Sequence, residues 1–407
     1  MRTISTHVPV SDTPKASASP RGRWFWILAG VGVSTALGVG FGSLIVNAGT
    51  GGNDYGGPLQ VLPTRTITIS EPVSSLSVQS YGANIQVIAR PVSRVTVAES
   101  IGFDPTAGGP PTVTHRVSHG LLTLAAPACA NTNCSVGFTV TVPSGVTVSA
   151  EGDGGAVTVS GTGAADLDSG GGPVAASAVS GPLNIAAEGG DVWASGASAA
   201  DIDSGGGQVT VAQIAGGLTV HAEGGGISVT SAGAAADLDS GGGPVTATGI
   251  SGPLTVTAEG GSVSVTSAPG TNIDSGGGPV TATRINGPLT VVAEGGGVDV
   301  NGVTGMLNAN TGGGPLQATA VTSSAVTAST NGGGATLQFA TVPKTLFVTT
   351  GGGTAVLSVP SAAYALTTDT GGGPQSVAIA NSPGAPNTIS VNTDGGGLEI
   401  GPPWAGG

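Results

Sequence analysis

A short motif of an acidic residue and a run of glycines recurs along the chain, and it constrains the fold more than any other feature. The sequence Ala-Glu-Gly-Gly starts at Ala187, Ala222, Ala258 and Ala293. Between these copies, Asp-Ser-Gly-Gly-Gly starts at Asp168, Asp203, Asp239 and Asp274. Together the two series place a glycine corner roughly every 18 residues. Corners without the acid continue at Gly312, Gly332, Gly351, Gly371 and Gly395. A period in this range is typical of a stacked repeat architecture.

The segments between the corners alternate apolar and small polar residues, which is the pattern of a strand. In one unit the apolar residues that can share a side are Val245, Ala247, Leu254, Val256, Ala258, Val263, Val265 and Ile273. Outward-facing residues are then Thr246, Thr248, Thr255, Thr257, Ser264 and Thr266. We therefore predict an all-β fold over residues 151–400, namely a parallel β-solenoid with turns of roughly 18 residues and two or more short strands per turn.

Glycine makes up 75 of the 407 residues, and a solenoid explains why the chain needs so many. A tight corner that repeats in register needs a backbone with positive φ and room for the corner of the neighbouring turn. Without a period, such a composition would indicate disorder, but the alternating strands argue against that. Val and Ala, with some Leu and Ile, suit a narrow interior.

The N-terminal 63 residues differ from the rest. Residues 1–23 are polar and are expected to be a disordered cytoplasmic tail. Residues 24–46 are uncharged and mostly apolar, follow Arg21 and Arg23, and predict one transmembrane helix with the repeats outside the cell. A signal peptide cleaved after Ala48 is the alternative. Residues 47–63 are expected to be a flexible linker.

Residues 64–150 contain irregularly spaced segments with period-two alternation, and we expect them to form a β-rich cap over the first turn. Residues 401–407 are expected to be a C-terminal tail. The two cysteines, Cys129 and Cys134, lie beyond the apolar segment in sequence, so a small-loop disulfide is the preferred interpretation. A zinc site needs more ligands than these thiols, and His115 and His119 supplement them poorly.

Charge is distributed unevenly. The formal net charge is −13, and residues 151–300 hold 15 acidic residues against one basic residue, Arg284. A nucleic-acid partner is therefore not expected. If successive corners stack, the acids could form one ladder at about 4.8 Å spacing, in which like charges repel and calcium could bind. The acids of this ladder are Asp168, Glu188, Asp203, Glu223, Asp239, Glu259, Asp274 and Glu294. Solvated carboxylates that bind nothing are the alternative.

The segment from Cys134 to Val148 contains the turn Val142-Pro143-Ser144-Gly145-Val146 and leads directly into the glycine-spaced strands. This arrangement resembles the bacterial putative-adhesin family of β-strand-repeat domains over about residues 64–400. The resemblance implies a cell-envelope protein with a parallel β-solenoid, and it brings no catalytic residues with it. The long Gly-Gly-Gly corners of this chain depart from the family pattern.

From these features we expect a membrane-anchored extracytoplasmic solenoid that acts as a surface adhesin or as a structural and interaction scaffold, with a protein or carbohydrate partner. A calcium-binding envelope repeat protein is the first alternative, and a polysaccharide-active β-helix enzyme is the second. We expect that the protein is not an enzyme and needs no cofactor. The candidate catalytic residues Arg284, Lys344 and His221 are far apart in sequence, and His221 is expected to face outward. Ordered threonines that bind ice or carbohydrate are disfavoured, because Thr246-Ala247-Thr248 becomes Ala175-Ala176-Ser177 in an earlier unit.

Overall fold

The computed structural model describes residues 59–126 and 133–403, and these residues contain strands and no helix. Accordingly, none of them belongs to a helix that could cross a membrane. The expected tail at 1–23, the expected transmembrane helix at 24–46 and the greater part of the expected linker lie outside the described residues. Strand β1 (Gln60–Val61) already begins within the range expected to be linker.

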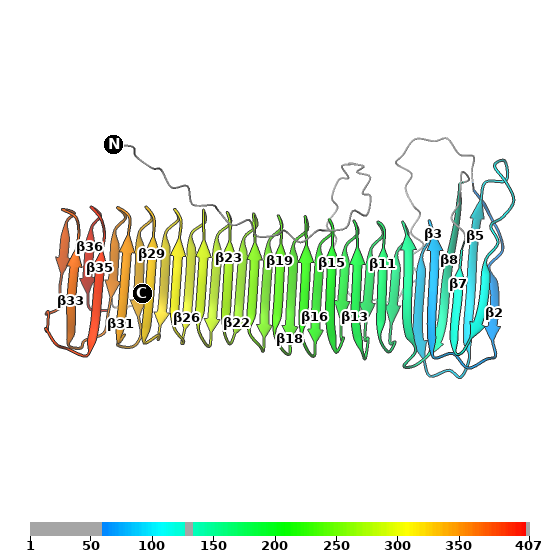
Figure 1. The fold of residues 1–407 in the computed structure, drawn as a ribbon, viewed down its shortest axis with the longest axis horizontal. Coiled ribbons are helices and arrows are strands. Elements are labelled where there is room, and N and C mark those ends of the chain that lie inside the picture. The colour runs from blue at the N-terminus through cyan, green and yellow to red at the C-terminus, as the bar shows by residue number, and fades with distance from the viewer. Residues whose placement is uncertain (1–58, 127–132, 404–407) are drawn as a thin grey trace, which may run out of the picture. The chain divides into compact units, whose positions relative to one another are not determined.

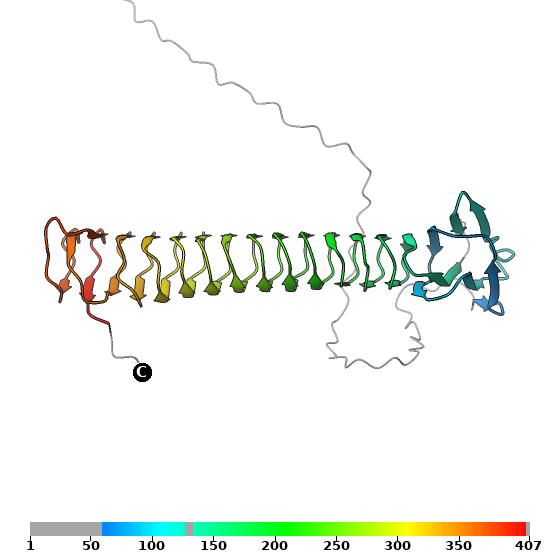
Figure 2. The same ribbon diagram turned by 90° about the horizontal axis from the view of Figure 1, so that it is seen from below.

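The chain forms a parallel β-solenoid of about 12 turns, as predicted (Figure 1). Each turn contributes one strand to each of two sheets, which form the two layers seen in Figure 2. The strands of sheet 1 are β9 (Thr147–Asp153), β11 (Ala165–Ser169), β13 (Pro182–Ala187), β15 (Ala199–Ser204), β17 (Leu218–Ala222), β19 (Ala236–Ser240), β21 (Leu254–Ala258), β23 (Thr271–Ser275), β25 (Leu289–Ala293), β27 (Leu307–Thr311), β29 (Ala325–Thr330) and β31 (Thr345–Thr350). The strands of sheet 2 are β10 (Val157–Ser160), β12 (Val174–Ser177), β14 (Val192–Ser195), β16 (Val209–Ile214), β18 (Ile227–Ala232), β20 (Val245–Ile250), β22 (Val263–Ala268), β24 (Val280–Ile285), β26 (Val298–Val303), β28 (Leu316–Val321), β30 (Ala335–Phe339) and β32 (Ala355–Ser358).

Strand register sets the length of each turn. Leu183 pairs with Ala165 of the preceding turn and with Ala200 of the next, so successive turns are 18 and 17 residues long. One turn of each length gives a motif spacing of 35 residues, and two turns of 18 residues give the spacing of 36 residues between Ala222 and Ala258. Toward the C-terminus the turns lengthen, since Leu307 pairs with Val326 and Val326 with Leu346. The parallel register stacks equivalent side chains in columns along the solenoid.

The core lies between the two sheets and matches the predicted inward set. Val245, Ala247, Leu254 and Val256 are at most 2% exposed, and the other four predicted residues are buried as well. The six Thr and Ser residues predicted to face outward are not buried. One core column of sheet 1 alternates between Ala and Leu from β11 to β17, and one core column of sheet 2 holds Val and Ile from β12 to β22.

We call the connection from sheet 1 to sheet 2 corner 1; its glycines are required chiefly by contact between turns. A Cβ on Gly225 would lie 1.9 Å from the carbonyl oxygen of Gly207, and a Cβ on Gly243 would lie 2.3 Å from that of Gly225. The predicted need for room is therefore confirmed. The predicted positive φ is wrong for these two glycines, and left-handed corner glycines occur mainly near the ends of the solenoid, as at Gly154, Gly332 and Gly352.

A buried hydroxyl closes corner 1 in alternate turns. The Ser240 hydroxyl donates to the carbonyl oxygen of Gly243 at 2.8 Å, and Ser169 donates to that of Gly172 at 2.7 Å. Ala258 pairs with Ser240 and takes its place in the next turn. The structural repeat is therefore a pair of turns, one with Ser followed by Gly and one with Ala followed by Glu.

A column of left-handed residues runs along the other end of the sheet 2 strands, and the sequence analysis missed it. Its members have φ between 51° and 74°; they are Gly161, Ala178, Gly196, Gln213, Ser231, Gly249, Ser267, Arg284, Gly302 and Ala320. At this point each strand bends toward corner 2, the connection back to sheet 1. Glycine occupies only some of these positions. The other residues adopt the left-handed conformation at a cost in free energy.

The N-terminal cap extends both sheets with antiparallel strands. Its strands are β1, β2 (Arg65–Ile69), β3 (Ser75–Tyr81), β4 (Ile85–Arg90), β5 (Val95–Phe103), β6 (Thr114–Ser118), β7 (Leu121–Ala125) and β8 (Cys134–Pro143). Strands β3 and β4 form the first turn, in parallel with β9 and β10. Sheet 1 then ends in β7 and the antiparallel β6, and sheet 2 ends in β8, β5 and β2. The edge of the stack is thus covered, as a terminal repeat requires.

The C-terminal end has an order of turns that the sequence analysis did not predict. The chain passes from β32 to β33 (Tyr364–Asp369) and β34 (Gln375–Val377), and then to β35 (Asn387–Asn392) and β36 (Leu398–Gly401). Strand β35 pairs with both β31 and β33, and β36 pairs with both β32 and β34. The last turn in sequence is therefore inserted inside the penultimate one, and Figure 1 shows β33 outside β35.

Candidate functional site

The predicted aspartates all lie on the outward face of sheet 1. Asp203 pairs with Ala186 on one side and His221 on the other, and His221 pairs with Asp239. Asp168 and Asp274 occupy the same column at the turns expected from this spacing. Aspartates therefore recur at every second turn, about 9.6 Å apart at the usual strand spacing.

The predicted glutamates form a second column in corner 1. Glu188 donates its backbone N–H to Ser169, and Gly205 donates to Ala187, so the ladder register continues into the corner. Glu188 is thus flanked by Gly170 and Gly205 in the adjacent turns. The single ladder at about 4.8 Å is therefore wrong. The acids instead alternate between two columns in a zigzag whose steps are diagonal, about 7–8 Å between Cα atoms.

Sequence reasoning missed further acids on the same face. Asp166, Asp201 and Asp237 precede the predicted aspartates by two residues and are exposed beside them, because residues two apart in a strand point to the same side. The recurring Asp-x-Asp pattern was the available signal. We call the carboxylates on the outward face of sheet 1, together with the glutamates of corner 1, the acidic strip, and each Asp-x-Asp pair widens it.

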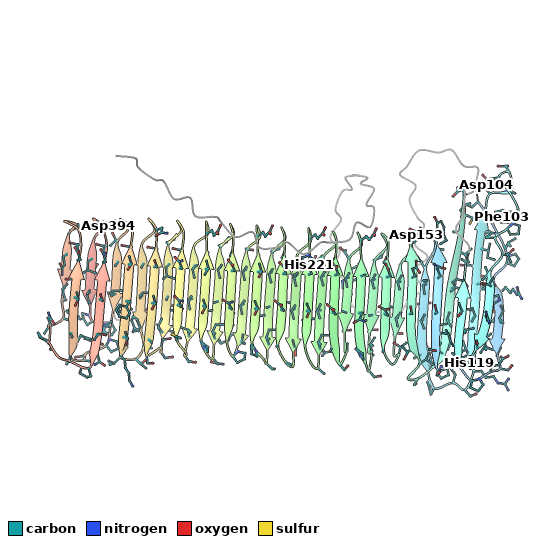
Figure 3. All side chains as sticks on the ribbon, in the orientation of Figure 1. Phe103, Asp104, His119, Asp153, His221 and Asp394 are labelled. Carbon is teal, nitrogen blue, oxygen red and sulfur yellow. The ribbon has the colours of Figure 1, made fainter. Side chains whose placement is uncertain are left out.

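Four acids line one pocket where the cap meets the solenoid. This pocket of about 590 Å³ is lined by residues that include Glu151, Asp153, Asp168, Glu188 and Gln79. The Gln79 Nε2 donates to Glu151 Oε2 at 3.1 Å. Figure 3 labels Asp153 at this end of corner 1 and Asp394 at the other end of the solenoid.

The protonation of Asp168 responds to this setting. Burial raises the pKa of Asp168 above its ordinary value of 3.8, and the negative charges of Glu151, Glu188 and Asp166 raise it further. Both causes disfavour the ionised form. An added proton or cation at Asp168 would therefore relieve repulsion from these neighbours.

His221 lies on the acidic face midway along the solenoid (Figure 3). Its Nδ1 is 3.0 Å from Oδ2 of Asp239, and both side chains are about half exposed. The outward position expected from the sequence is confirmed. A hydrogen bond to one aspartate gives His221 an ordinary surface role.

The described residues do not bring three or more His, Cys, Asp or Glu side chains together in an arrangement that could hold a metal ion. The zigzag explains this for the acidic strip, because calcium ligands must lie within about 2.6 Å of one ion. The eight predicted ligands are therefore not gathered around one point in this structure, and calcium association by them stays a prediction.

Cys134 is in a disulfide bond. Cys129 is the only other cysteine in the sequence, and it lies outside the described residues. The pairing of the two cysteines stays a prediction. Of the two histidines that were considered beside them, His115 contacts the buried carboxylate of Glu99 through its Nε2.

The outward face of sheet 2 has a different chemistry. From Thr158 to Thr283 its two outward columns hold no charged residue. The rows Ser228 with Thr230, Thr246 with Thr248, Ser264 with Thr266, and Thr281 with Thr283 stack in register. Toward the cap the same columns hold Ala175 and the exposed Trp193. We call this surface the hydroxyl face.

No family model matches the chain, and neither does any curated protein. Solved structures that are similar to it include a putative adhesin from Bacteroides fragilis, with 14% identity, a TM-score of 0.26, and coverage of 68% of this chain and 97% of that one. A putative adhesin from Parabacteroides distasonis shares 11% identity at a TM-score of 0.22, covering 84% of this chain and 97% of that one. A putative cell adhesion protein from Clostridium sporogenes shares 9% identity at a TM-score of 0.22, covering 50% and 99%. At such low values, function has to be inferred from this chain's own residues.

Proposed function

We propose that this protein is a membrane-anchored, extracytoplasmic rod that acts as a surface adhesin or interaction scaffold, without enzymatic activity. The observation that carries the proposal is the continuous stack of about 12 turns, which antiparallel strands extend at its N-terminal end. Such a stack holds two faces in fixed register along its length. A body of this kind is suited to presenting a surface.

The proposed anchor is the apolar segment at residues 24–46, with Arg21 and Arg23 before it. Basic residues next to an apolar segment favour the cytoplasmic side, so the repeats are placed outside the cell. A disulfide at Cys134 supports this location, because disulfides persist in oxidising compartments.

An adhesion assay tests the proposed function. The full chain is produced in a bacterial host that does not aggregate, and sedimentation of the cells and their retention on a coated surface are measured. The matched control produces residues 1–63 alone. Increased aggregation or retention with the full chain only is expected, whereas equal behaviour of the two strains would contradict the proposal.

Weak cation association is a second candidate, favoured by the raised pKa of Asp168 in the junction pocket. A cation there would relieve repulsion between Asp168 and its neighbours. The expected result is a higher melting midpoint in calcium than in sodium chloride of equal ionic strength, with a smaller difference in Asp168→Asn. Equal melting midpoints in the two salts would contradict cation association and would indicate that these carboxylates are only solvated.

A further inference from the structure

We infer that the hydroxyl face of sheet 2 binds a neutral linear polysaccharide and that Trp193 is its anchor. The inference rests on the proposed function, because it names the class of partner that the surface rod holds. Four features of the described residues lead to it: the exposed indole, the carboxylate beside it, the ordered hydroxyls that continue the face, and the absence of charged residues from its outward columns between Thr158 and Thr283.

Trp193 lies on the outward side of β14 and is 47% exposed. Its partners in the adjacent turns are Ala175 and Thr210, and Ser195 follows it on the same side of the strand. None of these side chains is large enough to cover an indole. A flat sheet therefore presents an aromatic surface, and aromatic rings with a polar edge are common anchors in binding surfaces.

Asp191 lies two residues before Trp193, at the edge of the same face. Its Oδ1 accepts a hydrogen bond from the backbone N–H of Gln208 at 2.9 Å, which orients the carboxylate. Among the described residues, Oδ2 has no other partner. A carboxylate oxygen that is held beside an aromatic ring can accept hydrogen bonds from the hydroxyls of a sugar stacked on that ring.

Ordered hydroxyls continue from this anchor along the solenoid. Thr210 comes first, and the rows from Ser228 with Thr230 to Thr281 with Thr283 follow in register. Each hydroxyl can donate and accept, and the sheet fixes its position before a ligand arrives. A chain of sugars laid along the rod would meet one row at about every 4.8 Å.

The distribution of charge indicates that this occupant is neutral. Most carboxylates of the solenoid lie on sheet 1 and corner 1, while Asp299 of β26 and Glu399 of β36 lie on sheet 2, so a polycation would be drawn chiefly to sheet 1. A polyanion would be repelled by a chain of net charge −13. An uncharged polymer rich in hydroxyls and C–H surface complements the neutral hydroxyls and the indole of sheet 2.

Calorimetric titration of the full chain with hexasaccharides tests the inference. The probes are cellohexaose, laminarihexaose, maltohexaose and mannohexaose, with hexagalacturonate as the acidic comparison and a detergent that carries no sugar head group. Binding of at least one neutral hexasaccharide is expected, and Trp193→Ala should weaken it about fivefold or more. Asp191→Asn should weaken it to a smaller extent.

Phe347→Ala is the matched control, because Phe347 is 49% exposed on sheet 1, away from the hydroxyl face. It should bind sugar like the unmodified chain. The inference is overturned if no neutral hexasaccharide binds, if Trp193→Ala binds as well as the unmodified chain, or if hexagalacturonate binds as tightly as the neutral probes.

The adhesion assay separates this inference from the proposed function. If Trp193→Ala abolishes cell aggregation while no sugar binds, the face serves a protein partner; the glycan inference fails and the adhesin proposal stands. If the unmodified chain neither aggregates cells nor binds sugar, both proposals fail. Sugar binding and aggregation that are both lost in Trp193→Ala would support both.

Discussion

Gly225 shows how strictly the stacking of turns selects single residues. Its Cα faces the Gly207 carbonyl oxygen so closely that an added Cβ would lie 1.9 Å away, where no side chain fits without moving backbone. Gly242 lies in the next corner 1 and has no atom within 4 Å of such a Cβ. Neither glycine has a left-handed φ. Two glycines of the same motif therefore carry opposite constraints.

The first prediction follows from this contrast. Gly225→Ala should destabilise the protein by about 1–3 kcal/mol or more, because two turns must be forced apart. Gly242→Ala should change stability by no more than about 0.5 kcal/mol. Melting midpoints from far-UV circular dichroism provide the measurement. Equal midpoints for the two variants would show that contact between turns does not fix these glycines.

A second prediction concerns the left-handed column. Ser231 has φ of 68°, a conformation that costs a residue with a side chain about 1–2 kcal/mol and costs glycine little. Ser231→Gly should therefore raise the melting midpoint. Ser228→Gly in the same strand lacks this strain and should lower it, because glycine weakens a strand interior. A change of the melting midpoint in the same direction for both variants would show that the left-handed φ of Ser231 does not cost stability.

The third prediction uses the raised pKa of Asp168. Because the native pKa lies above the unfolded one, the protonated group stabilises the fold below about pH 3.8, and this stabilisation is lost as the pH rises through the native pKa. Asp168→Asn should therefore melt at a higher temperature than the unmodified chain at pH 7, and at the same temperature at pH 3. The gain should stay below about 1 kcal/mol, because Asp168 is exposed. A gain that persists at pH 3 would rule out this electrostatic cause.

At this scale the sequence predicted which residues face inward and which turn corners, because the period-two pattern and the glycine runs are local signals. It could not separate the two reasons for glycine, since close contact and positive φ select the same residue type. The left-handed column had no signal either, because Gly, Ala, Gln, Ser and Arg all occur in it.

The acidic zigzag was misread as one ladder for a related reason. Asp168 and Glu188 belong to similar motifs, but Asp168 precedes the buried Ser169, whereas Glu188 follows the buried Ala187. The two acids therefore occupy different columns. Only strand register, which pairs Ser169 with Ala187, reveals this difference of two positions.

Among the elements, the two ends of the solenoid are the parts that differ most from a simple repeat. At the N-terminal end, β7 and β8 are parallel to the first turn and antiparallel strands follow, in accord with the expected irregular cap. At the C-terminal end, the glycine corners at Gly371 and Gly395 look like consecutive members of the repeat in sequence. Their exchanged order in space could not be predicted, because both turns carry the same local pattern.

Asn381 explains how the outermost turn ends the sheet. Its Oδ1 accepts the Leu366 backbone N–H at 3.0 Å, and its Nδ2 donates to the Leu366 carbonyl oxygen at 3.4 Å. The side chain thus occupies the place of a further strand beside β33. Ser382 adds a backbone hydrogen bond to Tyr364 at 2.8 Å. A loop covers this edge, which would otherwise pair with other chains.

The fourth prediction tests this cap. Asn381→Ala should speed hydrogen exchange in β33 about tenfold, since losing a buried or edge hydrogen bond costs on the order of 1 kcal/mol. Exchange in β31 should not change, because β35 lies between the two strands. Asn308→Ala, an exposed asparagine within β27, is the control and should leave β33 unaffected. Unchanged exchange of β33 in Asn381→Ala would show that the loop does not hold this edge.

In the described part of the chain, the two sheets carry different kinds of side chain on their outward faces. Most carboxylates lie on sheet 1 and corner 1, whereas the outward columns of sheet 2 from Thr158 to Thr283 hold uncharged residues, among them Trp193. The fold class and the turn length were predictable, because each turn repeats the same short code. The two faces were not, because assigning a residue to a face requires knowing that each turn holds exactly two strands.

We propose that this rod stands outside the cell on an N-terminal anchor, and labelling of intact cells tests this proposal most directly. Thr248→Cys places a thiol on the exposed hydroxyl face, and Ser17→Cys places one in the expected cytoplasmic tail. Each full-length variant is treated with a maleimide that cannot cross membranes, before and after lysis, beside the unmodified chain. We predict that Thr248→Cys is labelled on intact cells and that Ser17→Cys is labelled only after lysis. Labelling of Thr248→Cys only after lysis would contradict the account.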